Sequence, residues 1–235
     1  MSGAGPDAGP PTARLSGHGG TGGLLGGKVV VVTGGGAGIG GAVTRRLAAE
    51  GALLVVNDIE PAHLDAVTRD VTAGGGEVVA VPGDIRSEQV VEELARAALA
   101  ARDGRVDVLV NNVGDYRPPR RFLSAGRERW QELYAVNLEH VFACTYAIAP
   151  AMVASHAGSI VNVSTVEASR GIPRNAVYSA FNAGVEAFTR SLAVELGPEG
   201  VRVNAIAPDL TDTLQTPAEA MLGGRDPALV KLWLP

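Results

Sequence analysis

Residues 29–40 read VVVVTGGGAGIG, and this stretch decides how the chain folds. A run of β-branched residues ends in a dense group of glycines, and an Ala-rich stretch with helical spacing follows from Gly41 to about Glu50. A strand, a glycine turn and a helix in this order form the first half of a βαβ unit that binds a dinucleotide. Glycine lets a pyrophosphate approach the backbone without meeting a Cβ atom, and the free N–H groups of the helix then face the phosphates.

Because the chain contains 31 glycines, the turn alone is a weak signal, and a second feature strengthens it. Residues 52–58 read ALLVVND, which predicts a second strand that ends at Asp58, eighteen residues after Gly40. A carboxylate at this place accepts hydrogen bonds from the adenosine ribose hydroxyls and repels a 2′-phosphate, which favours NAD over NADP. The alternative is that Asp58 caps the helix that begins near Pro61.

The composition excludes several classes of protein. The net charge of −5 and the absence of a basic stripe argue against a nucleic-acid partner, and Arg117, Arg120 and Arg121 are interpreted as a solvated loop. No apolar run approaches the roughly 18 residues that span a bilayer. The single cysteine, Cys144, cannot form an internal disulfide, and no spacing of ligand residues indicates a metal site. We therefore expect a soluble cytoplasmic protein without a membrane partner.

The chain is expected to form one folded domain behind a tail. Residues 1–26 contain few large apolar groups, and we expect a disordered Gly/Pro-rich tail without a secretory signal. Residues 27–235 are predicted to form a single dinucleotide-binding catalytic domain. Alternating apolar runs and helical patterns favour an α/β fold, a doubly wound parallel sheet in three αβα layers. Strands are predicted at 28–33, 52–57, 77–82, 106–110, 158–163 and 201–206, and helices near 39–50, 61–74, 87–102, 127–154 and 177–197.

Two further segments follow predicted strands, where an open sheet places ligand-facing residues. Asp84 and Ile85 follow the third strand, and the Asp84 carboxylate either meets the adenine amino group or caps a helix. The sequence Asn111-Asn112-Val113-Gly114 follows the fourth strand. Its amides either brace the sheet edge or touch the adenosine ribose, and such turns are common in any case.

A third segment carries the candidate chemistry. Tyr178 and Asn182 lie four residues apart early in a predicted helix, so they share one face. Thr165 follows the fifth strand, thirteen residues before Tyr178, and Asn137 lies in the preceding long helix. A phenol and a hydroxyl that converge on one substrate oxygen can move a proton while hydride leaves or joins the adjacent carbon. Without the glycine turn, Tyr178 would be interpreted as an ordinary half-buried tyrosine.

Taken together, these segments resemble the short-chain dehydrogenase/reductase family from about Lys28 to Pro208. The family implies a Rossmann-type fold with a seven-stranded parallel sheet, binding of NAD or NADP, and interconversion of alcohols and carbonyls by homodimers or homotetramers. The segments that carry the resemblance are Thr33-Gly34 with Gly38-Ile39-Gly40, Asp84-Ile85, Asn111 to Gly114, Asn137, Asn162 to Thr165, Tyr178 to Asn182 and Arg202 to Pro208.

The resemblance assigns roles to individual positions. It implies that Tyr178 is the acid/base, that Thr165, with Ser164 beside it, orients the substrate oxygen, and that Asn137 supports a water-linked proton path. Thr211 matches a residue that touches the nicotinamide amide. The expected catalytic residues are thus Tyr178, Thr165, Asn137 and Asn182, and the expected NAD-binding residues are Gly34, Gly38, Ile39, Gly40, Asp58, Asp84, Ile85, Asn111, Gly114, Tyr178, Asn182, Pro208 and Thr211.

The chain also departs from the family pattern. Asn182 stands where the family has a lysine that holds the nicotinamide ribose and lowers the pKa of the tyrosine, and an amide carries no charge. The only lysines are Lys28, expected at the far end of the first strand, and Lys231. A hypothetical replacement for this charge is the positive potential of Arg170 or Arg174, in the loop before Tyr178.

Smaller departures are Thr165 for Ser, which narrows the pocket, Val113 for Ala and Asp209 for Gly. Because the sequence stops at Pro235, we also expect the last strand of the sheet to be missing and the sixth to form an edge.

Two functions are compatible with this pattern. The first is an NAD-dependent oxidoreductase that interconverts a secondary alcohol and a ketone, with Tyr178 as acid/base. The alternative is a catalytically impaired family member that binds a dinucleotide and acts as a sensor or structural partner, which the loss of the lysine and the early stop favour. The substrate cannot be read from the sequence, since residues 211–224, the expected lid, vary freely in such folds.

Overall fold

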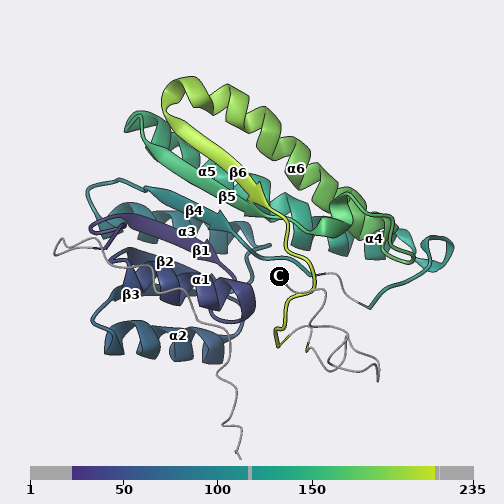
Figure 1. The fold of residues 1–235 in the computed structure, drawn as a ribbon, viewed down its shortest axis with the longest axis horizontal. Coiled ribbons are helices and arrows are strands. Elements are labelled where there is room, and N and C mark those ends of the chain that lie inside the picture. Colours follow the sequence, from purple (N-terminus) through teal and green to yellow (C-terminus); the bar gives the residue numbers. More distant parts are fainter. Residues whose placement is uncertain (1–22, 116–117, 215–216, 218–235) are drawn as a thin grey trace, which may run out of the picture.

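A computed structural model describes residues 23–115, 118–214 and 217 of the chain. Its centre is a parallel sheet of six strands in the order β3-β2-β1-β4-β5-β6, which Figure 1 shows from one side. All five pairings between neighbouring strands are parallel, as the alternation of strands and helices predicts. The strands are β1 (Val29–Thr33), β2 (Leu53–Asp58), β3 (Glu77–Pro82), β4 (Val108–Asn111), β5 (Gly158–Val163) and β6 (Val201–Ile206).

Helices cover both faces of the sheet, so the three-layer α/β arrangement is confirmed. One apolar cluster joins α1 and α2 to the first face, and a second cluster joins α3, α5 and α6 to the other. The central strands are buried on both faces: the four valines of β1 have 0% exposure. The helices are α1 (Gly38–Ala49), α2 (Pro61–Ala73), α3 (Glu88–Ala101), α4 (Arg127–Tyr134), α5 (His140–Ala154) and α6 (Ala176–Leu196).

The helix expected over 127–154 is divided. A π-helical segment, Ala135–Glu139, separates α4 from α5 and contains Asn137. A π-helical turn inserts an extra residue into the hydrogen-bond ladder, and such insertions occur mostly at functional sites. Sequence spacing gives no clear sign of one additional residue within a continuous apolar pattern, so the division could not be predicted.

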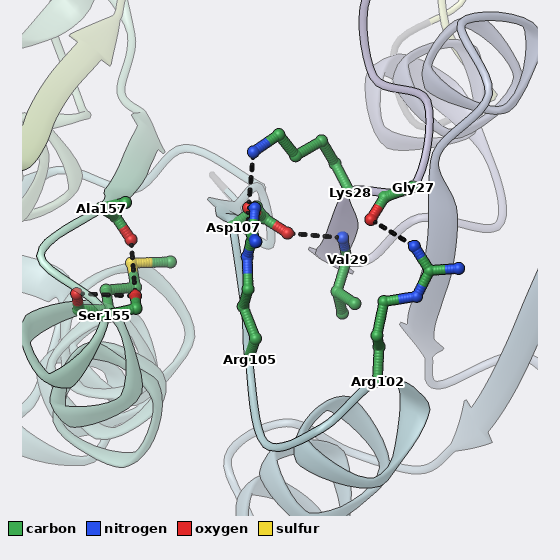
Figure 2. A network of polar contacts seen from close by, with 9 residues as sticks. Gly27, Lys28, Val29, Arg102, Arg105, Asp107, Ser155 and Ala157 are labelled. Carbon is green, nitrogen blue, oxygen red and sulfur yellow. Dashed lines mark hydrogen bonds and ion pairs between the residues drawn. The ribbon is translucent and has the colours of Figure 1, made fainter. Parts of the chain in front are cut away.

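The N-terminal ends of β1 and β4 are held together by charge (Figure 2). The Asp107 carboxylate accepts hydrogen bonds from Lys28 Nζ at 2.9 Å, from the Val29 backbone N–H at 2.9 Å and from Arg105 Nε at 2.9 Å. These bonds outweigh the burial that raises the pKa of Asp107, and they hold this pKa below its usual value. Lys28 therefore lies at the end of the sheet where the strands begin, opposite their carboxyl ends, as predicted.

Other expectations concern the ends of the chain. Residues 23–26, which the sequence analysis places in the tail, form a turn in which the backbone N–H of Leu25 donates to the Glu50 carbonyl at 2.9 Å. Residues 1–22, Lys231 and the rest of the segment after residue 217 lie outside the described residues, so the predictions for the tail, the last strand and most of the lid stay predictions. In the part of the chain that is described, no helix is long and apolar enough to cross a membrane.

Candidate active site

The glycine turn between β1 and α1 leaves the first turn of the helix open. Gly34 and Gly38 have φ angles of +60° and +54°, a region that favours glycine. A Cβ atom on Gly40 would lie 2.1 Å from the Gly34 carbonyl oxygen, so a side chain there cannot be accommodated. The residue that precedes α1, Ala37, provides no side-chain cap for the helix N–H groups. These backbone donors fit a pyrophosphate, and the residues present therefore suit a dinucleotide.

A cleft of about 980 Å³ opens at the carboxyl ends of the strands. It brings together residues from the glycine turn, from the loops after all six strands and from the start of α6. This is the place where open parallel sheets bind ligands. Of the residues expected to bind a cofactor or to act in catalysis, those that line the cleft are Gly34, Gly38, Ile39, Gly40, Asp58, Asp84, Ile85, Gly114, Thr165, Tyr178, Asn182, Pro208 and Thr211.

Asp58 is fixed at the end of β2. Its carboxylate accepts hydrogen bonds from the backbone N–H groups of Gly36 and Glu60, each at 3.0 Å, and it is 7% exposed. The residue at the N-cap of α2 is Glu60, so the alternative helix-capping role of Asp58 does not apply. The first backbone bond ties the carboxylate to the glycine turn, beside which it lines the cleft.

Asp84 lines the same end of the cleft and also does not cap a helix, because the N-cap of α3 is Ser87. Its carboxylate accepts a hydrogen bond from the Arg86 backbone N–H at 3.0 Å and pairs with the Arg86 guanidinium. The side-chain hydrogen bonds that Arg86 donates to Asp84 raise the pKa of Arg86 further above its usual value. Ile85, between them, is 3% exposed and anchors the loop in the core.

The two asparagines at the end of β4, Asn111 inside the strand and Asn112 directly after it, brace the sheet. Asn111 donates to Asn162 Oδ1 at 2.9 Å and to Thr145 Oγ1 at 3.2 Å, and its side chain does not line the cleft. Asn112 donates to the carbonyls of Thr33 and Gly34 at 3.0 and 3.1 Å. The sequence offered two interpretations of these amides. The geometry of Asn111 supports the bracing role and does not support a direct contact with the ribose.

Thr165 and Tyr178 meet in the cleft. Thr165 directly precedes a short 3₁₀ turn, Val166–Ala168, and its side chain is close enough to Tyr178 to lower the pKa of the phenol. The hydroxyl of Ser164 turns away toward α6, where it donates to the Asn182 carbonyl at 3.3 Å and to Glu186 Oε1 at 3.2 Å. Thr165, rather than its neighbour, is therefore the hydroxyl that faces the phenol.

The surroundings of Tyr178 oppose its ionisation. Burial and the negative charges of Glu167 and Asp115 raise the pKa of Tyr178 to about 12, while the hydrogen bond with Thr165 lowers it only in part. From the sequence alone, Glu167 is compatible with the pocket lining but better fits a surface or packing position, and Asp115 is not singled out. Both follow a strand at the carboxyl edge of the sheet, and this position is the signal by which they could have been found.

The two other expected catalytic residues are held by backbone groups. Asn182 is 5% exposed, and its Nδ2 donates to the Tyr178 carbonyl at 3.1 Å. Asn137 donates to the carbonyls of Leu133 and Asp115 at 2.9 and 3.0 Å and accepts from the Asp115 N–H at 3.1 Å. Asn137 does not line the cleft, so it acts here by fixing the loop after β4 against the π-helical segment.

The arginines considered as a source of positive potential are placed differently. Arg170 pairs with Asp209 at 2.6 Å, and this bond lowers the pKa of Asp209. Arg174 has a φ angle of +73°, its carbonyl accepts from the Arg120 N–H, and it lines a small hollow beside the cleft rather than the cleft. Neither arginine is among the groups that shift the pKa of Tyr178, so the hypothesis receives no support. Among the described residues, no group of acidic, histidine or cysteine side chains could hold a metal ion.

Comparison with known proteins agrees with this geometry. The family model for short chain dehydrogenases matches residues 28–220, and the chain therefore belongs to the short-chain dehydrogenase/reductase family. A 3-oxoacyl-(acyl-carrier-protein) reductase from Synechocystis is 39% identical over 183 residues, which are 75% of this chain and 73% of the relative. Family members are oxidoreductases that bind a nicotinamide dinucleotide.

Two solved structures show the same fold. A metagenomic short-chain oxidoreductase in complex with NADP has a TM-score of 0.74 at 35% identity, covering 78% of this chain and 83% of its own. Carveol dehydrogenase from Mycobacterium avium in complex with NAD has a TM-score of 0.79 at 28% identity. The match covers 86% of this chain and 78% of the carveol dehydrogenase chain.

Proposed function

We propose that this protein is an NAD-dependent oxidoreductase that interconverts a secondary alcohol and a ketone, with Tyr178 as the acid/base. The observation that carries the proposal is the meeting of the Tyr178 and Thr165 hydroxyl groups in the same cleft as the open glycine turn. The glycine turn would hold the phosphates of a dinucleotide, which would supply hydride transfer in the cleft that these hydroxyls line. This arrangement suits proton transfer at an oxygen beside a carbon that gains or loses hydride.

Two features favour NAD over NADP. Asp58, fixed by two backbone N–H groups, offers its carboxylate to ribose hydroxyls and repels an added phosphate. The charges of the cleft act in the same direction, because carboxylates outnumber arginines among the described residues that line it. These are Asp58, Glu60, Asp84, Asp115, Glu167 and Asp209, against Arg86 and Arg170.

The nicotinamide, when bound, accepts or supplies the hydride. In the direction of oxidation, Tyr178 takes the proton of the substrate hydroxyl group, and Thr165 holds the same oxygen by a hydrogen bond. Asn182 lines the cleft with its amide nitrogen already bonded to the helix backbone, which leaves its amide oxygen to accept a hydrogen bond from a ribose hydroxyl. Asn137 keeps the loop after β4 in place and so maintains the floor of the cleft.

The proposal is tested by cofactor binding and turnover together. We expect calorimetry to show tighter binding of NAD than of NADP, and absorbance of the reduced cofactor to increase with some members of a panel of secondary alcohols. Asp58→Asn keeps the shape of the side chain and removes its charge, so it should reduce the preference for NAD. Equal affinity for both cofactors in the unaltered protein contradicts the assignment of NAD.

One observation favours a second candidate, a dinucleotide-binding protein without turnover that acts as a sensor or structural partner. The pKa of Tyr178 is raised to about 12, and Asn182 carries no charge that could lower it. Tight NAD binding without turnover of any alcohol, in a protein that gains activity with Asn182→Lys, would select this candidate. The homodimer or homotetramer and the cytoplasmic location expected from the sequence stay predictions.

A further inference from the structure

Glu167 holds a carboxylate at the reacting end of the cleft. Its backbone N–H donates to Thr165 Oγ1 at 3.3 Å, and its Oε2 accepts a hydrogen bond from Asn175 Nδ2 at 2.8 Å. Asn175 is 7% exposed and lines the cleft with Glu167 and Tyr178, so a buried amide fixes the orientation of the carboxylate. The charge of Glu167 reaches the phenol, since it raises the pKa of Tyr178. A group bound by this carboxylate therefore lies beside the reacting oxygen.

The Glu167 carboxylate is oriented but not neutralised. A neutral amide donates a hydrogen bond without supplying charge, and no described residue forms an ion pair with Glu167. The two arginines that line the cleft are engaged elsewhere, because Arg86 pairs with Asp84 and Arg170 with Asp209. A cation that enters the cleft next to Glu167 gains an attraction that a neutral group of the same size does not.

We infer that Glu167 selects substrates that carry a protonated amine on the carbon next to the reacting carbon. These are 1,2-amino alcohols whose hydroxyl group is secondary, and the corresponding α-amino ketones. This inference rests on the proposed oxidoreductase function. The ammonium group donates hydrogen bonds to the Glu167 carboxylate, and its positive charge favours the phenolate form of Tyr178. The substrate thus supplies the charge that the described part of the cleft lacks at this point. A substrate with a carboxylate at the same position is repelled.

The test compares small secondary alcohols that differ in charge, two of which, 1-amino-2-propanol and 2-butanol, are isosteric. The probes are 1-amino-2-propanol, 2-butanol and 3-hydroxybutanoate, assayed with NAD below about pH 8, where a primary amine is charged. We expect kcat/KM to be about tenfold or more higher for the ammonium compound than for 2-butanol, and lowest for the carboxylate. The variant Glu167→Gln should lose this order, with activity falling on 1-amino-2-propanol and rising on 2-butanol. The matched control is Glu195→Gln, which removes an exposed carboxylate on α6. It should leave the order of kcat/KM among the three probes unchanged.

Opposite changes on the two substrates cannot arise from a misfolded variant, which loses activity on both. Turnover of 2-butanol with no preference for the ammonium compound overturns the inference and leaves the proposed function intact. If no alcohol is turned over, the proposed function fails, and binding of the same three probes to the NADH-saturated protein, followed by ligand-observed NMR, decides the inference. Preferential binding of 1-amino-2-propanol that Glu167→Gln abolishes supports it, and equal binding overturns it.

Discussion

Tyr178 is surrounded by groups that keep its phenol protonated. Burial removes the water that would stabilise a phenolate, and Glu167 and Asp115 add negative potential. The side chain of Asn182, one helical turn further along α6, donates to the backbone and contributes no charge. We therefore expect little phenolate at neutral pH, and a slow proposed reaction under these conditions.

Asn182→Lys should raise the rate of alcohol oxidation at neutral pH. A cation at this position lowers the pKa of Tyr178, and each unit by which that pKa falls increases the phenolate fraction about tenfold. We expect a gain in kcat of about tenfold or more and a shift of the alkaline rise to lower pH, measured by steady-state kinetics. Asn182→Gln is the neutral control of similar length. An equal effect of Lys and Gln at this position would show that size, not charge, is responsible.

At the scale of elements, the start of α1 is the part of the fold to which the proposed function assigns phosphate binding. Gly40→Ala places a Cβ atom 2.1 Å from the Gly34 carbonyl oxygen, so the turn must shift and its N–H groups lose their alignment. We expect NAD binding, measured by calorimetry, to weaken by about tenfold or more, which is about 1.4 kcal/mol. Gly126→Ala is the control, because a Cβ atom there meets nothing within 4 Å. Unchanged affinity in the first variant, with the fold intact by circular dichroism, would contradict the phosphate site.

The sequence predicts these elements well for a physical reason. Strands such as β1 are buried on both faces and consist of β-branched residues, so their limits follow from the apolar run and the glycine that ends it. The π-helical segment around Asn137 was missed, because one inserted residue does not disturb the apolar pattern. The side-chain partners of Asn111 could not be predicted either, since the residues it contacts lie 34 and 51 positions away in the sequence.

For the candidate site as well, the sequence predicts some features and misses others. Motif spacing brought together the glycine turn, Asp58, Thr165 and Tyr178, which do line one cleft. It did not show that Arg170 is neutralised by Asp209, which depends on how the loops after β5 and β6 meet. It also did not show that Glu167 acts on the phenol, which depends on how the turn after β5 packs against α6. Pairing between loops is decided by tertiary packing, which spacing along the chain does not contain.

At the scale of the whole molecule, the two ends of the sheet have different tasks. The carboxyl ends of the strands form the cleft, while Asp107 joins the amino-terminal ends of β1 and β4 at the opposite end of the sheet (Figure 2). Asp107→Asn removes the charge-assisted bonds with Lys28 and Arg105 and should reduce the free energy of unfolding by about 1–3 kcal/mol at pH 7. Urea denaturation measures this loss, and Asp65→Asn, on the exposed face of α2, is the control.

The same bond predicts how stability depends on pH. The folded-state pKa of Asp107 lies below its unfolded value, so its contribution is fully present above the unfolded pKa and is lost as the pH falls through the folded one. The difference in unfolding free energy between the unaltered protein and Asp107→Asn should therefore shrink below about pH 4. A difference that stays constant down to pH 2 would show that Asp107 does not act through its charge.

The rate of cofactor reduction between about pH 7 and 10, measured in single turnovers with the unaltered protein and with Tyr178→Phe, tests the central claim most directly. Because the pKa of Tyr178 is about 12, the phenolate fraction rises about tenfold for each pH unit in this range. The rate should rise in proportion, and Tyr178→Phe should lack this rise and be slower by a factor of about 10²–10⁴ at about pH 10. A rate that does not change with pH, or a phenylalanine variant as fast as the unaltered protein, would contradict the role of Tyr178 as the acid/base.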